Sequence, residues 1–178
     1  MKFILLLCKK IKFILFKNIQ NFLKYKYKLS IMSSVAECGE GLRVNGKSFA
    51  TKNTYLGKNV NFNGMKITGG GAVYIDDYFH SGQNCQIITS IHNYEGSEIP
   101  YDSSYIDKSV TIEKIVWLGN NVNVLGGRTI GEGAIIQAGS VVCKNIPKYA
   151  IAGGHPAVVF KYRDIEHYNT LKKMNKFH

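Results

Sequence analysis

Apolar and small residues recur every six positions between residues 118 and 146, a period that fits neither an α-helix nor an alternating β-strand. Six residues match one short strand plus a turn, and three such units close a triangular coil. Stacked coils of this kind predict a solenoid with a continuous apolar interior. The first row of the repeat contains Leu118, Val124, Ile130, Ile136 and Val142, and a second row, four residues behind, contains Val122, Arg128, Ala134, Ser140 and Ile146.

The same period continues toward the N-terminus in a weaker form. Leu56-Gly57 is followed by Val60, and Ser81-Gly82 is followed by Cys85 at the same spacing. We expect the larger apolar residues to point inward. The glycine or small polar residue after an inward position suits a tight corner, where we expect glycine to supply unusual backbone angles. The solenoid is therefore predicted over residues 36–160.

The repeat is interrupted over residues 93–108, which read NYEGSEIPYDSSYIDK. Gly, Pro, Ser and Asp in this stretch indicate a loop that leaves the coil, and the period returns by Val110 or Ile112. Long loops on a rigid scaffold often carry function, so we expect the loop to contribute to a site.

Residues 1–35 form a separate segment in which apolar clusters alternate with lysines. One interpretation is a helix that packs on a neighbouring subunit, or a frayed terminus. The other is an amphipathic helix at a membrane interface, with Phe and Leu entering lipid and Lys meeting anionic headgroups through residues 1–30. The sequence leaves both open.

The C-terminal residues 161–178 are predicted to form a short helix folded against the coil. Its lysines at positions 172, 173 and 176 are expected to be solvated. The apolar residues that recur at a spacing of three are Tyr162, Ile165, Tyr168, Leu171, Met174 and Phe177.

The net charge of +11 is concentrated at one end of the chain. Residues 1–30 contain eight lysines and no acid, and the remaining 15 Lys and Arg face 12 Asp and Glu. This distribution indicates a basic segment and no nucleic-acid groove. Four dispersed cysteines and the lack of a secretory signal favour a reduced, cytoplasmic protein, located at the inner face of the cytoplasmic membrane if residues 1–30 bind lipid.

The block over residues 116–159 resembles the hexapeptide-repeat acetyltransferases, which include galactoside, maltose and xenobiotic acetyltransferases and surface-glycan O-acetyltransferases. The most specific parts are V-W-L-G, A-G-S-V-V and the closing I-P-K-Y-A-I-A-G-G-H-P-A. The resemblance implies an all-β, left-handed parallel β-helix; the hand comes from the resemblance alone. It also implies a homotrimer that holds acetyl-CoA in the groove between adjacent subunits.

The resemblance assigns His92, at the junction before the loop, as the general base. A sugar hydroxyl is a poor nucleophile until its proton is removed as it attacks a thioester, and an imidazole can accept a proton near neutral pH. We expect His80 to be structural and His155 to belong to a turn. The γ-class carbonic anhydrases share this fold and bind zinc through a close histidine pair, but His80 and His92 are twelve residues apart, so we assign no metal site.

Most of the remaining site residues are carried over from the family by position. Cys143 stands where the family commonly has Thr, and Val158 stands where a basic residue often occurs. An Asn-Phe-Asn segment that resembles one in the galactoside enzymes makes Asn61 an acceptor candidate. Further candidates come from their place in the loop after His92 and not from the family: Tyr94, Glu95, Tyr101 and Asp102. The cofactor residues implied are Trp117 and Asn120 beside the pantetheine arm, Ala138 at the pantetheine amides, and Cys143, Lys144 and Lys161 toward the nucleotide phosphates.

These observations predict an acetyl-CoA-dependent O-acetyltransferase acting on a sugar hydroxyl by direct transfer, with the sugar in a bacterial surface polysaccharide or its precursor. The alternative is acetylation of a small diffusible acceptor, such as a free galactoside or an antibiotic. A non-enzymatic scaffold is the third interpretation.

Overall fold

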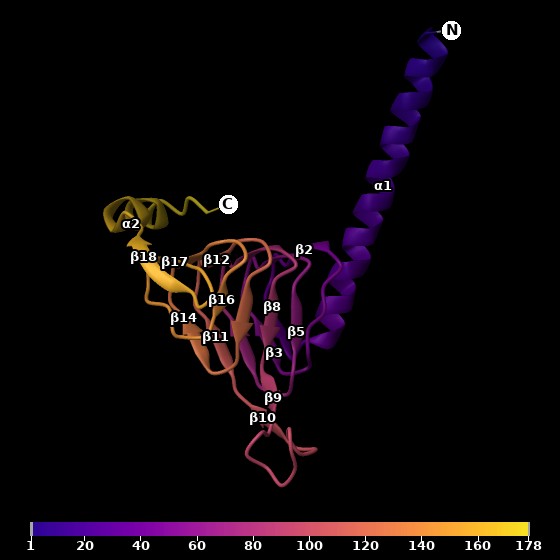
Figure 1. The fold of residues 1–178 in the computed structure, drawn as a ribbon. Helices are drawn as coiled ribbons and strands as arrows, with labels where there is room; N and C mark the ends of the chain where they lie inside the picture. The colour runs from indigo at the N-terminus through magenta and orange to yellow at the C-terminus, as the bar shows by residue number, and fades with distance from the viewer. Residues whose placement is uncertain (1, 178) are drawn as a thin grey trace.

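The computed structural model describes the backbone of residues 2–177 and the side chains of residues 9, 10 and 12–177. From residue 37 onward the chain winds as a parallel β-helix, in which successive coils contribute short strands to three sheets (Figure 1). The predicted β-helix of hexapeptide repeats is confirmed, as is a helix at each end.

The three sheets have the following strands, in spatial order. The five-stranded sheet contains β1 (Glu37–Cys38), β3 (Thr54–Leu56), β6 (Val73–Ile75), β11 (Val110–Ile112) and β14 (Arg128–Ile130). The seven-stranded sheet contains β18 (Val158–Tyr162), β17 (Ala150–Gly153), β15 (Ile135–Ile136), β12 (Trp117–Leu118), β7 (His80–Gln83), β4 (Asn61–Asn63) and β2 (Arg43–Gly46). The four-stranded sheet contains β16 (Val141–Val142), β13 (Asn123–Leu125), β8 (Gln86–Ile88) and β5 (Lys66–Thr68).

The interior follows the six-residue period. All five members of the first row, from Leu118 to Val142, have no solvent exposure. In the second row Arg128 departs from the pattern, because it is only half-buried while the other four members are buried. Backbone hydrogen bonds between parallel strands hold successive coils together. The Trp117 N–H, for example, donates to the Ala134 carbonyl of the next coil at 3.0 Å.

The corners do not use glycine as the sequence suggested. Gly57, Gly82 and Gly119, which follow inward positions, do not have positive φ, so the expectation that these glycines supply unusual backbone angles is wrong. They are required by the close approach of the next coil: a Cβ on Gly119 would lie 2.5 Å from the Ala138 nitrogen. Before each of the six parallel strands of the seven-stranded sheet, the residue two positions ahead of the outward one has left-handed backbone angles. These corner residues are Gly41, Asn59, Tyr78, Ile115, Gly133 and Tyr149.

One hairpin leaves the coil where the four-stranded sheet passes to the five-stranded sheet. β9 (Ser90–His92) pairs antiparallel with β10 (Tyr105–Asp107), and residues 93–104 form its tip. The chain rejoins the coil at β11, where Val110 pairs with Val73. The three sheets form the faces of a triangular prism. The hairpin projects from the edge between the four-stranded and five-stranded sheets, at the bottom of Figure 1.

One helix packs on each end region of the β-helix: the N-terminal helix lies beside the first coil, and the C-terminal helix lies over the outer face of the seven-stranded sheet (Figure 1). The last turns of α1 (Lys2–Ser34) pack beside β2, with Ile31 buried among the core residues Leu42 and Val44. The N-terminal half of α1 stands away from the body (Figure 1). In the part of the chain that is described, no helix has a stretch long and apolar enough to cross a membrane.

At the other end, β18 turns back antiparallel on β17 and leads into α2 (Ile165–Lys173). Residues 161 and 162, expected in the helix, lie in β18. The helix starts four residues later than expected because Asp164 caps it, accepting a hydrogen bond from the His167 N–H at 2.9 Å.

Candidate functional site

Side chains of the seven-stranded sheet form a ladder on its outer surface. In-register pairing places Asn61 beside His80, His80 beside Trp117, and Trp117 beside Ile135, while Ile151 follows in β17. The neighbouring residue on each strand is buried, so these five point outward. Residues far apart in sequence thus form one continuous strip.

The middle of this strip opens into a cavity of about 720 Å³, which we call the Trp117 groove. Trp117 is 49% exposed, and Asn120 and Ala138 stand at the corner beside it. The Asn120 side-chain oxygen accepts a hydrogen bond from the backbone N–H of Gln83 at 2.8 Å. Because Gln83 belongs to the preceding coil, this bond holds the Asn120 side chain against that coil. The groove is lined by Asn63, His80, Gly82, Gln83, Trp117, Gly119, Asn120, Ile135, Ile136, Gln137 and Ala138.

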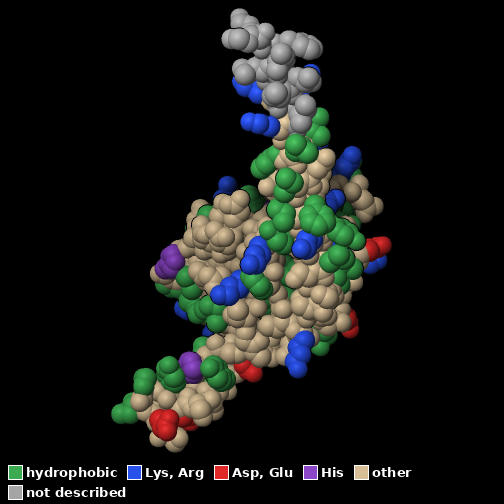
Figure 2. Space-filling model, turned by 90° about the vertical axis from the view of Figure 1, so that its right-hand side faces the viewer, with side chains coloured by type: hydrophobic (Ala, Val, Ile, Leu, Met, Phe, Trp, Pro, Cys, Tyr) green, Lys and Arg blue, Asp and Glu red, His purple; other side chains and the backbone are tan. Residues whose placement is uncertain are grey.

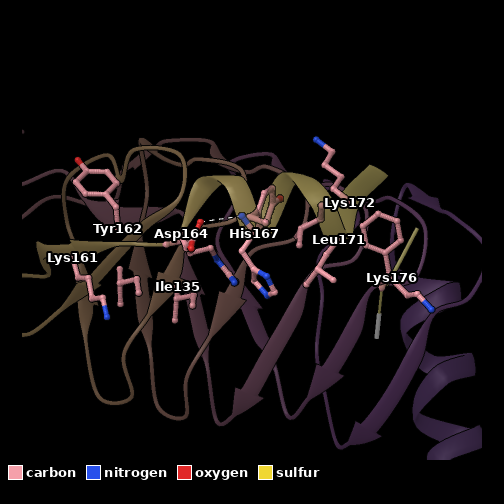
Figure 3. Close-up of a pocket in the computed structure, with 13 residues that line it drawn as sticks. Ile135, Lys161, Tyr162, Asp164, His167, Leu171, Lys172 and Lys176 are labelled. Carbon is pink, nitrogen blue, oxygen red and sulfur yellow. Dashed lines mark hydrogen bonds between the residues drawn. The ribbon is translucent and has the colours of Figure 1, made fainter. Parts of the chain in front are cut away.

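A second cavity of about 410 Å³ lies between α2 and the same sheet, and we call it the basic cavity (Figure 3). Lys161 enters it from β18, Lys176 from the C-terminal tail, and His167 points from α2 toward the sheet. Arg163 also lines it, and its Nε donates to the Gly133 carbonyl at 2.6 Å. Because Ile135 lines both cavities, the groove and the basic cavity adjoin.

Glu132 holds α2 in place. Burial alone would raise the pKa of this carboxyl, but the ion pair with Lys172 and the hydrogen bond donated by the Tyr168 hydroxyl outweigh it, and the pKa of Glu132 is lowered. Burial, together with the Glu132 charge, raises the pKa of Tyr168. Lys172, expected to be solvated, is instead paired, since α2 lays it across Glu132.

His92 is the last residue of β9, directly before the hairpin tip, and lies between two aromatic rings. Its imidazole stacks on Tyr101 with ring centroids 3.8 Å apart, and the ring of Tyr105 lies at 4.5 Å. Its Nδ1 is buried and makes no hydrogen bond to any described residue. The stacking fixes the orientation of the ring and leaves Nε2 as the nitrogen able to take part in chemistry.

The hairpin tip is organised by Asp102. Its carboxylate accepts hydrogen bonds from the backbone N–H groups of Ser97 and Ser104, at 3.1 and 2.9 Å, and from the Ser104 hydroxyl. These bonds lower the pKa of Asp102. Tyr94 and Glu95 are exposed at this tip, Tyr94 by 64%.

The predicted site residues fall on two sides of the chain. One side is the seven-stranded sheet with its adjoining corner, and the other is the edge from which the hairpin leaves. Cys143 and Lys144 follow β16 at the same edge, before Ile146 bridges to Ile130. The sheet side carries Asn61, Trp117, Asn120, Ala138 and Lys161, and the edge side carries His92, Tyr94, Glu95, Cys143 and Lys144. A single chain does not bring His92 to Trp117, since the hairpin and β12 lie on opposite sides of the prism (Figure 1).

Sequence reasoning missed several residues of these two regions. His80, expected to be structural, lines the Trp117 groove, and the hexad register already placed it one coil before Trp117. Tyr105 beside His92 carried the weaker signal of an aromatic residue at the end of a loop. Arg163 and His167 had no signal, because only the docking of α2 brings them to the sheet.

Comparison with known proteins agrees with this fold. A family model described as bacterial transferase hexapeptide (six repeats) matches residues 109–144. The galactoside O-acetyltransferase of Lactococcus lactis subsp. lactis is 34% identical over 114 residues, which cover 63% of this chain and 54% of that protein. The chain thus spans about half the length of this curated relative.

Solved structures give the same result. A galactoside acetyltransferase in complex with coenzyme A superposes with a TM-score of 0.65 at 28% identity, covering 74% of this chain and 68% of that one. A hexapeptide-repeat-containing acetyltransferase from Vibrio cholerae O1 biovar eltor, complexed with acetyl coenzyme A, gives 0.52 at 27% identity, covering 71% and 63%. The resemblance to hexapeptide-repeat acetyltransferases is confirmed in both sequence and fold.

Proposed function

We propose that this chain, similar in sequence and fold to the hexapeptide-repeat acetyltransferases, is an acetyl-CoA-dependent O-acetyltransferase that modifies a sugar hydroxyl. The observation that carries the proposal is the Trp117 groove, around which three of the predicted cofactor residues meet: Trp117, Asn120 and Ala138. The similar proteins support it, since they are named as galactoside acetyltransferases and one is complexed with coenzyme A.

The two adjoining cavities fit the two ends of acetyl-CoA. The groove offers an aromatic ring at Trp117 and amides at Asn120 and Gln137, which suit an amide-containing apolar arm. The basic cavity offers Lys161 and Arg163, which suit phosphates. Bound acetyl-CoA would supply the thioester carbonyl, to which the sugar oxygen forms a bond as the carbon–sulfur bond breaks.

His92 is the proposed general base of this transfer. Since Nδ1 is buried, Nε2 would accept the hydroxyl proton of the sugar and then return it to the departing thiolate, which leaves His92 neutral after each turnover. Tyr101 and Tyr105 position the ring by stacking. Tyr94 and Glu95, on the same hairpin, and Asn61, on the sheet side, are the proposed acceptor contacts.

We further propose that the working enzyme is a homotrimer with each site between two subunits. The support is the distribution of the site residues over two sides of one chain: the hairpin edge of one subunit has to meet the seven-stranded sheet of the next for His92 to reach the Trp117 groove. In that arrangement Cys143 and Lys144 would approach the nucleotide from the same subunit as His92.

Transfer by purified protein tests the reaction and the base together. Incubation with acetyl-CoA and a panel of galactosides should release free CoA thiol, and His92→Ala should slow this release by about 10²–10⁴-fold while coenzyme A binding persists. His155→Ala, an exposed histidine in the turn before Ala157, is the matched control and should keep full activity. Near-normal turnover by His92→Ala would refute the assignment.

The proposed acceptor is a sugar of a surface polysaccharide or its precursor, modified on the cytoplasmic side of the membrane. Mass spectrometry of the cell-surface glycan with and without the gene should show loss of acetyl groups. An unchanged glycan, together with acetylation of a free galactoside or an antibiotic in vitro, would favour the small-molecule alternative.

A further inference from the structure

α1 carries a large apolar surface that none of the described residues covers (Figure 2). On one side Ile31 is buried and Tyr27 packs against the core. Elsewhere Phe13, Phe16 and Phe22 are 68%, 61% and 62% exposed. Exposed apolar patches of this kind mark interaction sites. The other exposed large apolar residues of the helix are Ile14, Leu15, Ile19, Tyr25, Leu29 and Met32.

The exposed apolar residues surround the helix over residues 13–16. Phe13, Ile14, Leu15 and Phe16 are consecutive, and consecutive residues lie about 100° apart, so these four span most of the circumference. A groove on another protein covers one side of a helix. The pattern therefore favours a fluid medium, such as the headgroup region of a bilayer, which can surround the part of a helix that enters it.

The charge of α1 restricts the partner further. Seven of its lysines have described side chains, and no acidic residue occurs before Glu37. Bundling α1 with the same helix of other copies would bring lysines together with no carboxylate between them, which is unfavourable. An anionic partner supplies the missing charge.

We propose that α1 binds the surface of an anionic lipid bilayer. Phe13 to Phe16 would enter the boundary between headgroups and acyl chains, and the long stems of Lys9, Lys10, Lys12 and Lys17 would let their ammonium groups stay among the phosphates. This inference rests on the composition and exposure of α1 and is independent of the proposed reaction.

Sedimentation of the full chain with lipid vesicles tests the proposal. We expect binding to phosphatidylcholine vesicles that contain phosphatidylglycerol, much weaker binding to phosphatidylcholine alone, and loss of binding as salt is raised. Lys12→Gln with Lys17→Gln should weaken binding by about 25-fold, roughly fivefold for each lysine. The matched control, Lys52→Gln with Lys173→Gln, removes two exposed lysines elsewhere and should bind normally.

Replacement of Phe13 and Phe16 by Ser should also abolish sedimentation with vesicles, whereas Phe49→Ser, at an exposed phenylalanine of the β-helix, should not. Mass photometry of each variant separates lipid binding from self-association. Equal binding to both vesicle types, no binding to either, or an assembly that falls apart when Phe13 and Phe16 are replaced would overturn the proposal; the last outcome would identify a second copy as the occupant.

Discussion

Adjacent residues on one short strand have opposite environments in this fold. On β15, Ile136 is fully buried in the core and Ile135 points outward into the two cavities. On β12, Leu118 and Trp117 are divided in the same way. Stability and ligand contact are therefore separated by one position along the chain, which allows each to be tested alone.

Ile136→Ala should lower the free energy of unfolding by about 2–5 kcal/mol, because it leaves a cavity in a closely packed interior. Ile135→Ala is the matched control at the neighbouring residue and should cost less than about 1 kcal/mol, since this side chain is only partly buried and leaves no closed cavity when it is shortened. Urea denaturation monitored by circular dichroism measures both. Similar losses for the two variants would contradict the inward and outward assignment.

Trp117→Ala should weaken coenzyme A binding by about tenfold or more, because the groove loses its largest apolar surface. Isothermal titration calorimetry with coenzyme A measures this change. Tyr74→Ala removes a comparably exposed aromatic residue from the five-stranded sheet and should leave the affinity unchanged. Unaltered affinity in Trp117→Ala would place the pantetheine arm elsewhere.

At the scale of elements, α2 is attached to the β-helix by few strong contacts. Tyr168 is its one buried residue, and its hydroxyl donates to Glu132, which also pairs with Lys172. Gly133, with φ of +70°, lies directly under the Tyr168 ring, where an added Cβ would approach to 2.9 Å. The basic cavity depends on this attachment, because α2 forms one of its walls.

The attachment of α2 should depend on pH. Since the pKa of Glu132 is lower in the folded chain, the pair stabilises the fold above the ordinary glutamate pKa of about 4.3 and loses this contribution as the pH falls through the lower folded value. We expect limited proteolysis to cleave between residues 163 and 178 much faster at acidic pH than at neutral pH.

Glu132→Gln provides the comparison. It should lower stability at neutral pH by about 1–3 kcal/mol and flatten the acid dependence, because no charge remains to be titrated at this position. Cleavage that accelerates at acidic pH to the same extent in both proteins would show that another group controls the attachment.

At the scale of the whole molecule, the proposed site needs two chains. His92 belongs to the hairpin edge and Trp117 to the opposite sheet, so a site that uses both is built from neighbouring subunits. Sedimentation velocity should accordingly give the mass of a trimer, and a monomer with full transferase activity would contradict the proposal.

Subunit complementation tests the shared site directly. Co-expressed His92→Ala and Trp117→Ala chains should recover activity well above either variant alone, because some interfaces in the mixed trimers keep both native residues. In the control, His92→Ala is co-expressed with a chain that carries both substitutions, and no activity should return. Absence of complementation in an assembled mixed trimer would place both residues in a site within one chain.

The β-helix, its core rows and the position of the interruption can be predicted from the sequence alone. These depend on a local repeat, in which each six residues encode one strand, one inward residue and one turn. Trp117 could likewise be singled out because it lies in a contiguous stretch that resembles the family, and His92 because it stands where the repeat is interrupted.

Which of these residues meet depends on how the coils stack and where the C-terminal helix docks. Gln83 and Asn120 are hydrogen-bonded although 37 positions separate them, because the hairpin is inserted between two stacked coils. The same stacking, and not a special backbone angle, requires Gly119, and the docking of α2 creates the basic cavity. Contacts between coils depend on how many residues are inserted between them and on where the terminal helices dock. A six-residue period carries no information about either.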